Sequence, residues 1–158
     1  QVNMDIWFKH LMTKKNLSWK MPPEEEPERE KQRQRSKELV SKQQQTYAEG
    51  GLGLLIDATG RIYGTVEKIK NELENQGYQT TMIFVNTDLE TALRRNKERE
   101  RTLPDELIHK NYKVIEQNIG RFQRLFDDVH IINNSDTVQN EVPEQLEQLE
   151  KEIRKFLQ

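Results

Sequence analysis

Apolar residues gather in three short runs along a chain that is otherwise mostly polar. The runs span residues 52–57 (LGLLID), 81–85 (TMIFV) and 129–133 (VHIIN). They are largely continuous rather than alternating in polarity, which favours strands of a parallel sheet that is covered on both faces. We interpret residues 1–3 as the end of a fourth strand.

Helical patterns alternate with these runs. Apolar residues recur at helical spacing in residues 62–76 and again after Pro143. Asp5 and Asp88 stand where helix N-caps are expected. Residues 27–48 are almost entirely polar, which fits a solvated helix. The composition of residues 22–45 is also typical of disorder. The order of elements, β-α-α-β-α-β-α-α-β-α, predicts an α/β fold with a parallel sheet.

Composition limits the possible functions. The 158 residues predict a single domain, and 33% of them are apolar, with a net charge of −2. No apolar run approaches the roughly 20 residues of a membrane span and no signal peptide opens the chain, so we expect a cytoplasmic protein without membrane contact. The absence of cysteine excludes disulfides and thiolate catalysis. Three separated histidines argue against a histidine metal cluster.

The first candidate site is the segment that follows the apolar run 52–57. Asp57 ends this run and would place a carboxylate at the carboxyl edge of the sheet, where α/β folds bind ligands. Thr59 adds a hydroxyl and Arg61 a cation. Such a carboxylate can bind Mg²⁺ or a substrate hydroxyl. The alternative is that Asp57 only caps the next helix. Asp5, at the end of the expected first strand, is open to the same two interpretations.

The second candidate site is a basic segment at residues 94–101. It holds five basic and two acidic residues. Arg95 and Arg99 are four positions apart and would share a helix face, and guanidinium groups bind phosphate through paired hydrogen bonds. The segment lies between two helices, so residues 94–104 could form a lid over an anionic ligand. The alternatives are a solvated charged surface or a local nucleic-acid contact.

Several motifs resemble the phage-type P-loop kinases, the group that includes polynucleotide kinase and zeta toxin. They are LIDATGR at 55–61, FVNT at 84–87, and ALRRNKER at 92–99 followed by Leu103-Pro104. VNMD at 2–5 is similar to the segment that follows the P-loop helix in that group. The resemblance implies a three-layer α/β fold with a parallel sheet and a helical lid.

The same resemblance implies roles for individual residues. Asp5 matches the general base that takes the proton of the substrate hydroxyl, and Arg95 and Arg99 match the lid arginines that stabilise the transferring phosphoryl group. The substrate-binding positions would be Asp57, Thr59, Arg61 and Arg101.

The implied ligands are ATP with Mg²⁺ and an acceptor that is a nucleoside, a nucleotide, a sugar or a nucleic-acid end. No direct protein cage for the metal is expected. Phe8 stands where polynucleotide kinase has an arginine for the nucleic-acid phosphate, which argues against a polynucleotide acceptor.

The chain contains no G-x-x-x-x-G-K-[ST] loop. We therefore expect a truncated kinase that lacks its P-loop strand and helix, is inactive in isolation and does not bind ATP tightly. The strands near residues 2 and 54 would then lie apart from those near 83 and 131, with two unpaired inner edges. The alternative is a non-catalytic binding or assembly protein with kinase-like topology, in which a homo-oligomer covers the open sheet edges. Either protein would work in the cytoplasm of a bacterium, encoded by it or by a phage.

Overall fold

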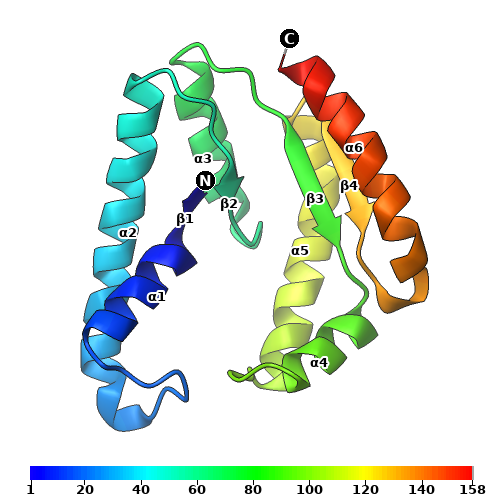
Figure 1. The fold of residues 1–158 in the computed structure, drawn as a ribbon. Coiled ribbons are helices and arrows are strands. Elements are labelled where there is room, and N and C mark those ends of the chain that lie inside the picture. The colour runs from blue at the N-terminus through cyan, green and yellow to red at the C-terminus, as the bar shows by residue number, and fades with distance from the viewer. Residues whose placement is uncertain (158) are drawn as a thin grey trace. The chain divides into compact units, whose positions relative to one another are not determined.

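The computed structural model describes residues 1–157 and divides the chain into two compact units. The first comprises Gln1–Thr59 and the second begins at Gly60. Strands and helices follow one another in the predicted order, with two short 3₁₀ helices added (Figure 1). The first strand pairs with the second and the third with the fourth, and both pairs are parallel. This confirms the α/β class with parallel strands.

The first unit is a helical hairpin attached to a very short strand pair. Its elements are β1 (Val2–Asn3), α1 (Met4–Lys14), η1 (Pro23–Glu25), α2 (Glu26–Glu49) and β2 (Ile56–Asp57). Strand β1 runs parallel to β2, with Asn3 opposite Asp57. The backbone N–H of Val2 donates to the carbonyl of Leu55 at 2.7 Å. Helix α1 packs along α2 (Figure 1).

The buried face of α2 is polar, although the helix was expected to be solvated. Phe8 and Met12 of α1 are almost fully buried, and so are Arg29, Gln32 and Ser36 of α2. These polar groups are satisfied locally, since Ser36 Oγ donates to the carbonyl of Gln32 at 2.8 Å and Arg29 Nη1 donates to the carbonyl of Pro22 at 3.1 Å. A polar stripe can therefore form a helix interface without orphaned donors.

Two local predictions in the first unit are wrong. The run 52–57 forms a strand only at its last two residues, and Leu52 and Leu55 are exposed by 52% and 60%. Helix α1 is capped by Asn3 and not by Asp5, because the Asn3 side chain accepts the N–H groups of Asp5 and Ile6. Asp5 instead lies in the first turn of α1, where its charge complements the helix dipole.

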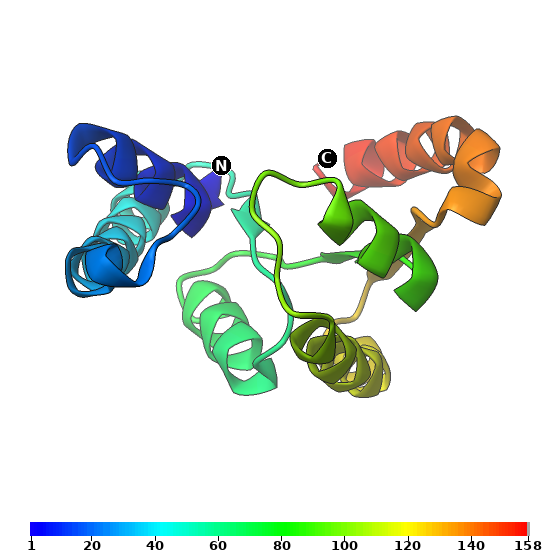
Figure 2. The same cartoon turned by 90° about the horizontal axis from the view of Figure 1, so that it is seen from below.

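The second unit contains a two-stranded sheet with helices on both faces. Its elements are α3 (Tyr63–Glu74), β3 (Met82–Asn86), α4 (Leu89–Lys97), α5 (Asp105–Leu125), β4 (Val129–Asn133), η2 (Asp136–Glu141) and α6 (Val142–Phe156). Strands β3 and β4 pair in parallel over five residues, from Met82 opposite Val129 to Asn86 opposite Asn133. Helices α5 and α6 lie on opposite faces of this pair (Figure 2).

The four strands form two parallel sheets of two strands each, β1 with β2 and β3 with β4. Among the described residues, the strands near residues 2 and 54 therefore share no sheet with those near 83 and 131. Within residues 1–157, no helix is both long and apolar enough to cross a membrane.

We expect Ser36→Leu to destabilise the first unit by about 1–3 kcal/mol, because a larger side chain must enter the closed interface between α1 and α2. Ser36 is completely buried. Urea denaturation followed by circular dichroism measures the change. Ser41→Leu, at an exposed position of the same helix, is the matched control and should change stability by less than about 0.5 kcal/mol. Equal effects of the two substitutions would contradict the polar interface.

Candidate functional site

The carboxyl ends of β1 and β2 bring two predicted site residues to one edge. Asn3 Nδ2 donates to Asp57 Oδ2 at 2.6 Å, while Asn3 Oδ1 accepts the backbone N–H of Asp5 at 2.7 Å. Asn3 thus links the Asp57 carboxylate to the first turn of α1. The side chains of Asp5 and Asp57 are exposed, so both carboxylates are accessible to a ligand.

The turn that follows β2 is anchored at its far end by α5. The buried side chain of Asn118 donates through Nδ2 to the carbonyls of Gly60 and Arg61, both at 3.0 Å. Gly60 has a φ of +65°, and a Cβ there would lie 3.5 Å from the Phe122 ring. Glycine suits this position because its backbone is in the left-handed region and packs against an aromatic ring. The backbone of Arg61 is therefore held in position by Asn118.

Thr59 and Arg61 differ in how their side chains are held. The Arg61 guanidinium makes one long hydrogen bond, from Nη1 to Asn111 Oδ1 at 3.4 Å. The Thr59 side chain is exposed. Thr59 is the last residue of the first unit and Arg61 belongs to the second.

A polar network joins the carboxyl ends of β3 and β4. The backbone N–H of Asp88 donates to Ser135 Oγ at 2.8 Å. Thr91 Oγ1 donates to Asp88 Oδ2 at 2.9 Å and accepts the backbone N–H of Asp136 at 3.1 Å. Thr91 and Ser135 are buried. The network fixes the start of α4 against the turn after β4, and Asp88 caps α4 as predicted.

The predicted lid arginine Arg95 is bound by a carboxylate at the end of this network. Its Nη2 donates to Asp136 Oδ1 at 2.9 Å. Arg94 Nε donates to the other oxygen of the same carboxylate at 2.8 Å. Hydrogen bonds from Arg94, and secondarily from Arg95, hold the pKa of Asp136 below its usual range. The three side chains form an ionised cluster.

The segment between α4 and α5 is a closed loop. The buried Asn96 side chain donates through Nδ2 to the carbonyl of Leu103 and accepts the N–H of Leu103, both at 2.9 Å. Arg99 and Arg101 lie exposed in the loop that this pair closes. The Arg99 guanidinium has no hydrogen-bond or ion-pair partner among residues 1–157. Of the two predicted phosphate-binding arginines, Arg99 is free and Arg95 is engaged.

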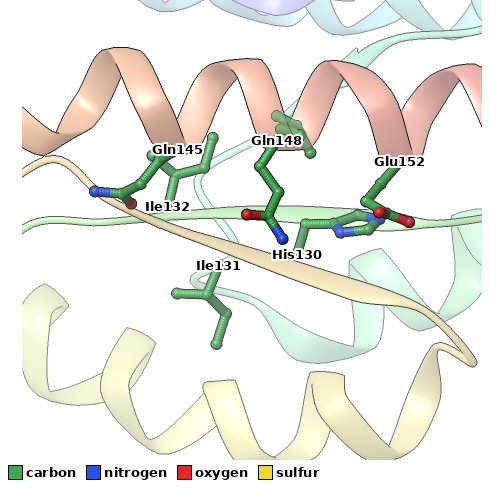
Figure 3. A pocket seen from close by; sticks show the side chains of 7 residues that line it. His130, Ile131, Ile132, Gln145, Gln148 and Glu152 are labelled. Carbon is green, nitrogen blue, oxygen red and sulfur yellow. The ribbon is translucent and has the colours of Figure 1, made fainter.

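A shallow cavity of about 240 Å³ lies elsewhere, between β4 and α6 (Figure 3). Gln148 and Glu152 of α6 reach over the ring of His130, while Ile131 points to the opposite face of β4 (Figure 3). Gln145 Oε1 accepts the backbone N–H of Asn133 at 2.8 Å. None of the predicted site residues lines this cavity, so we do not assign the candidate chemistry to it.

In the second unit, Arg95 and Arg99 carry guanidinium groups, which are suited to phosphoryl oxygens. In the first unit, Asp5 and Asp57 carry carboxylates, which can accept a hydrogen bond from a hydroxyl. Within residues 1–157, no three histidine, aspartate or glutamate side chains are grouped to hold a metal ion. The phosphate cradle of a P-loop has no counterpart in the sequence.

Three supporting residues were missed by sequence reasoning. They are Asn3, Asn118 and Asp136, and each acts by holding a candidate residue or its backbone. Asp136 lies three residues after a predicted strand, near its carboxyl end, whereas Asp57 is the last residue of its run. Asn3 and Asn118 had no comparable signal, since their partners lie more than 50 residues away in sequence.

These features describe an α/β protein with carboxylates at strand ends and an arginine-rich loop between two helices. A family model described as zeta toxin matches residues 24–141, about three quarters of the chain, and the chain belongs to the zeta toxin family. Members of this family are ATP-using P-loop proteins. The match includes every predicted site residue except Asp5. A comparison with curated proteins finds no match.

We expect Asn96→Ala to open the loop between α4 and α5. The substitution leaves the N–H and carbonyl of Leu103 unpaired and should cost about 1–3 kcal/mol. Trypsin should then cleave after Arg99 and Arg101 faster than in the unmodified protein, as followed by mass spectrometry. Asn71→Ala, at an exposed asparagine of α3, is the control. Equal cleavage rates in the two variants would contradict the role assigned to Asn96.

We expect Asp88→Ala to destabilise the protein by about 1 kcal/mol at pH 7, since it removes a helix cap. The hydrogen bond from the Thr91 N–H, and secondarily the hydrogen bond with the Ser135 side chain, lower the pKa of Asp88 from its ordinary value of 3.8. The stabilisation that the ionised Asp88 gives to the folded state is therefore present above pH 3.8 and is lost as the pH falls through the lowered pKa. Urea denaturation at several pH values should show the two proteins converging in acid.

The control for this measurement is Asp127→Ala, at an exposed position. Its stability relative to the unmodified protein should change little between pH 7 and pH 3. A difference between Asp88→Ala and the unmodified protein that stays constant in acid would show that the charge of Asp88 plays no part.

Proposed function

We propose that this zeta toxin family member is a kinase that transfers the γ-phosphoryl group of ATP to a hydroxyl of an acceptor, in the presence of Mg²⁺ and in the cytoplasm. The acceptor classes are a nucleoside, a nucleotide, a sugar and a nucleic-acid end. The family match supports the reaction class, and the local geometry supports the roles that follow.

The loop from Asn96 to Leu103 is the observation that carries the proposal. Two hydrogen bonds of one buried side chain close it. It presents to solvent the guanidinium of Arg99, which has no partner among the described residues 1–157. An arginine without a protein partner on a defined loop has all its donors available for an anion. We assign Arg99 to the transferring phosphoryl group, whose charge is spread over three oxygens in the transition state.

The edge formed by β1 and β2 is our candidate for the acceptor side. We propose that Asp5 takes the proton of the acceptor hydroxyl. The oxygen of that hydroxyl then forms the new bond to the γ-phosphorus while the bond between the γ-phosphorus and the leaving ADP breaks. Asp57 is held by Asn3 at 2.6 Å and keeps its other oxygen for an acceptor hydroxyl. Thr59 and Arg61 follow as acceptor contacts, with Arg101 in the lid loop.

The environment of Phe8 favours a small acceptor over a polynucleotide. Phe8 is 4% exposed, with its ring edge-on to Trp19 and the Arg33 guanidinium 5.3 Å from its centre. A core residue at this position offers no cation to a nucleic-acid phosphate. The net charge of −2 likewise provides no general attraction to nucleic acid.

We also propose that residues 1–158 by themselves do not bind ATP tightly and do not turn it over. No stretch of this sequence supplies the glycine-rich amides, lysine and hydroxyl that cradle phosphates in a P-loop. Isothermal titration of the 158-residue chain with Mg·ATP tests this point, and micromolar binding would contradict it.

We expect Arg99→Ala in the full-length protein to lower kcat for phosphoryl transfer by about 10³-fold or more, as for other arginines that stabilise this transition state. Transfer of label from γ-³²P-ATP to a panel of the four acceptor classes measures it. Arg99→Lys should restore only part of the rate, because an ammonium cannot donate the paired hydrogen bonds of a guanidinium.

Lys97→Ala is the matched control, since Lys97 is an exposed cation two residues away. It should leave kcat nearly unchanged. If Arg99→Ala and Lys97→Ala behave alike, the loop contributes only general charge and Arg99 has no special role. If no acceptor class is phosphorylated by the unmodified full-length protein, the proposed function fails.

A second candidate function is a non-catalytic assembly protein, and it is favoured by apolar exposure in the second unit. Val85 of β3 is 56% exposed, Ile131 of β4 47% and Leu146 of α6 49%. A homo-oligomer would cover such side chains. Light scattering coupled to size exclusion separates the cases, because a monomer across the micromolar range would remove this candidate.

A further inference from the structure

Asp136 binds two consecutive arginines with one carboxylate. It is the first residue of η2, three positions after the end of β4. Oδ2 accepts Arg94 Nε at 2.8 Å and also Arg94 Nη2. Oδ1 accepts Arg95 Nη2 at 2.9 Å. Both oxygens of the carboxylate are therefore occupied, each by a different guanidinium.

The two arginines are not used in the same way. Arg94 donates through Nε and Nη2 to Asp136 and through Nη1 to Glu98, so every nitrogen of its guanidinium is engaged. Arg95 donates to Asp136 only through Nη2. Its Nε and Nη1 have no partner within residues 1–157. Arg94 therefore has no nitrogen left to bind a ligand, whereas the Nε and Nη1 of Arg95 can still donate hydrogen bonds to one.

The carboxylate of Asp136 is itself held in place. Its backbone N–H donates to Thr91 Oγ1 at 3.1 Å, and Thr91 is tied to the α4 cap Asp88. Arg94 and Arg95 lie on the same helix that Asp88 begins. Asp136 and the two arginines are therefore connected through the same hydrogen-bond network. If Asp136 moved together with the Arg95 side chain, its hydrogen bond to Thr91 would break.

We propose that Asp136 is a positioning residue for Arg95, holding one edge of its guanidinium so that the other edge faces a phosphoryl oxygen. This inference rests on the proposed kinase function. A guanidinium that is already oriented loses less conformational freedom when it binds the transition state than a free side chain does. Arg95 would in this way differ from Arg99, which must be ordered by the ligand.

A double-mutant cycle tests the proposal in the full-length protein. Asp136→Asn keeps the size of the side chain and removes its charge, and it should lower kcat by about 10²-fold, as a misplaced catalytic contact does, with little change in KM for ATP. If Asp136 acts through Arg95, Asp136→Asn should cause no further loss in an Arg95→Ala background. A full further loss would overturn the proposal.

Glu98→Gln is the matched control, because Glu98 is a carboxylate that binds Arg94 but not Arg95. It should leave kcat nearly unchanged, and a loss equal to that of Asp136→Asn would overturn the proposal. Asp136→Glu keeps the charge and displaces the carboxylate by one methylene group. It should fold even if Asp136→Asn does not, and it should retain more activity than Asp136→Asn and less than the unmodified protein.

A readout without substrate separates this inference from the proposed function. In the ligand-free protein, the ¹⁵N relaxation of Arg95 Nε should report an ordered guanidinium that becomes mobile in Asp136→Asn and stays ordered in Glu98→Gln. If the Arg95 signal is mobile in the unmodified protein, the proposal is wrong whatever the activity. If the signal is ordered as expected but no acceptor is phosphorylated, the kinase function is wrong and the orientation of Arg95 stands.

Discussion

The hydroxyl of Thr91 is the contact on which the candidate lid depends. It donates to the carboxylate of Asp88 and accepts the backbone N–H of Asp136, and so it joins the turn after β3 to the turn after β4. A sheet of only two strands cannot fix these turns by strand pairing alone, since each strand has a single hydrogen-bonded neighbour. Buried side-chain hydrogen bonds supply the missing constraint, and they are strong because no water competes for them.

Side-chain hydrogen bonds from asparagines also hold three other candidate segments. Asn3 connects Asp57 to the start of α1, Asn96 closes the loop that carries Arg99, and Asn118 fixes the backbone of Arg61. Each of these asparagines donates through its amide nitrogen, and Asn3 and Asn96 also accept through the amide oxygen. An amide can serve two backbone or side-chain partners without adding charge, which suits positions close to charged groups that must remain available to a ligand.

The order of helices and strands could be predicted because it depends on local patterns. Runs of apolar residues and a cap such as Asp88 are visible in a few consecutive residues. The residue that caps α1 could not be predicted so well, because Asn3 and Asp5 are both good caps and the choice depends on Asn3 also reaching Asp57. The length of β2 was also overestimated. Leu52 and Leu55 are apolar and so predicted a buried strand, but both side chains are exposed and β2 contains only Ile56 and Asp57.

Arg95 and Arg99 show the limit of residue type as a guide to function. Their spacing on one helical pattern made them equivalent in the sequence, yet α4 ends at Lys97, so Arg95 is on the helix and Arg99 is in the loop. Arg95 is 25% exposed and shares a carboxylate with Arg94, whereas Arg99 is solvated. The distinction comes from Asp136, 41 residues away, and so a pair of like arginines acquires unequal roles only through a long-range contact that no local pattern records.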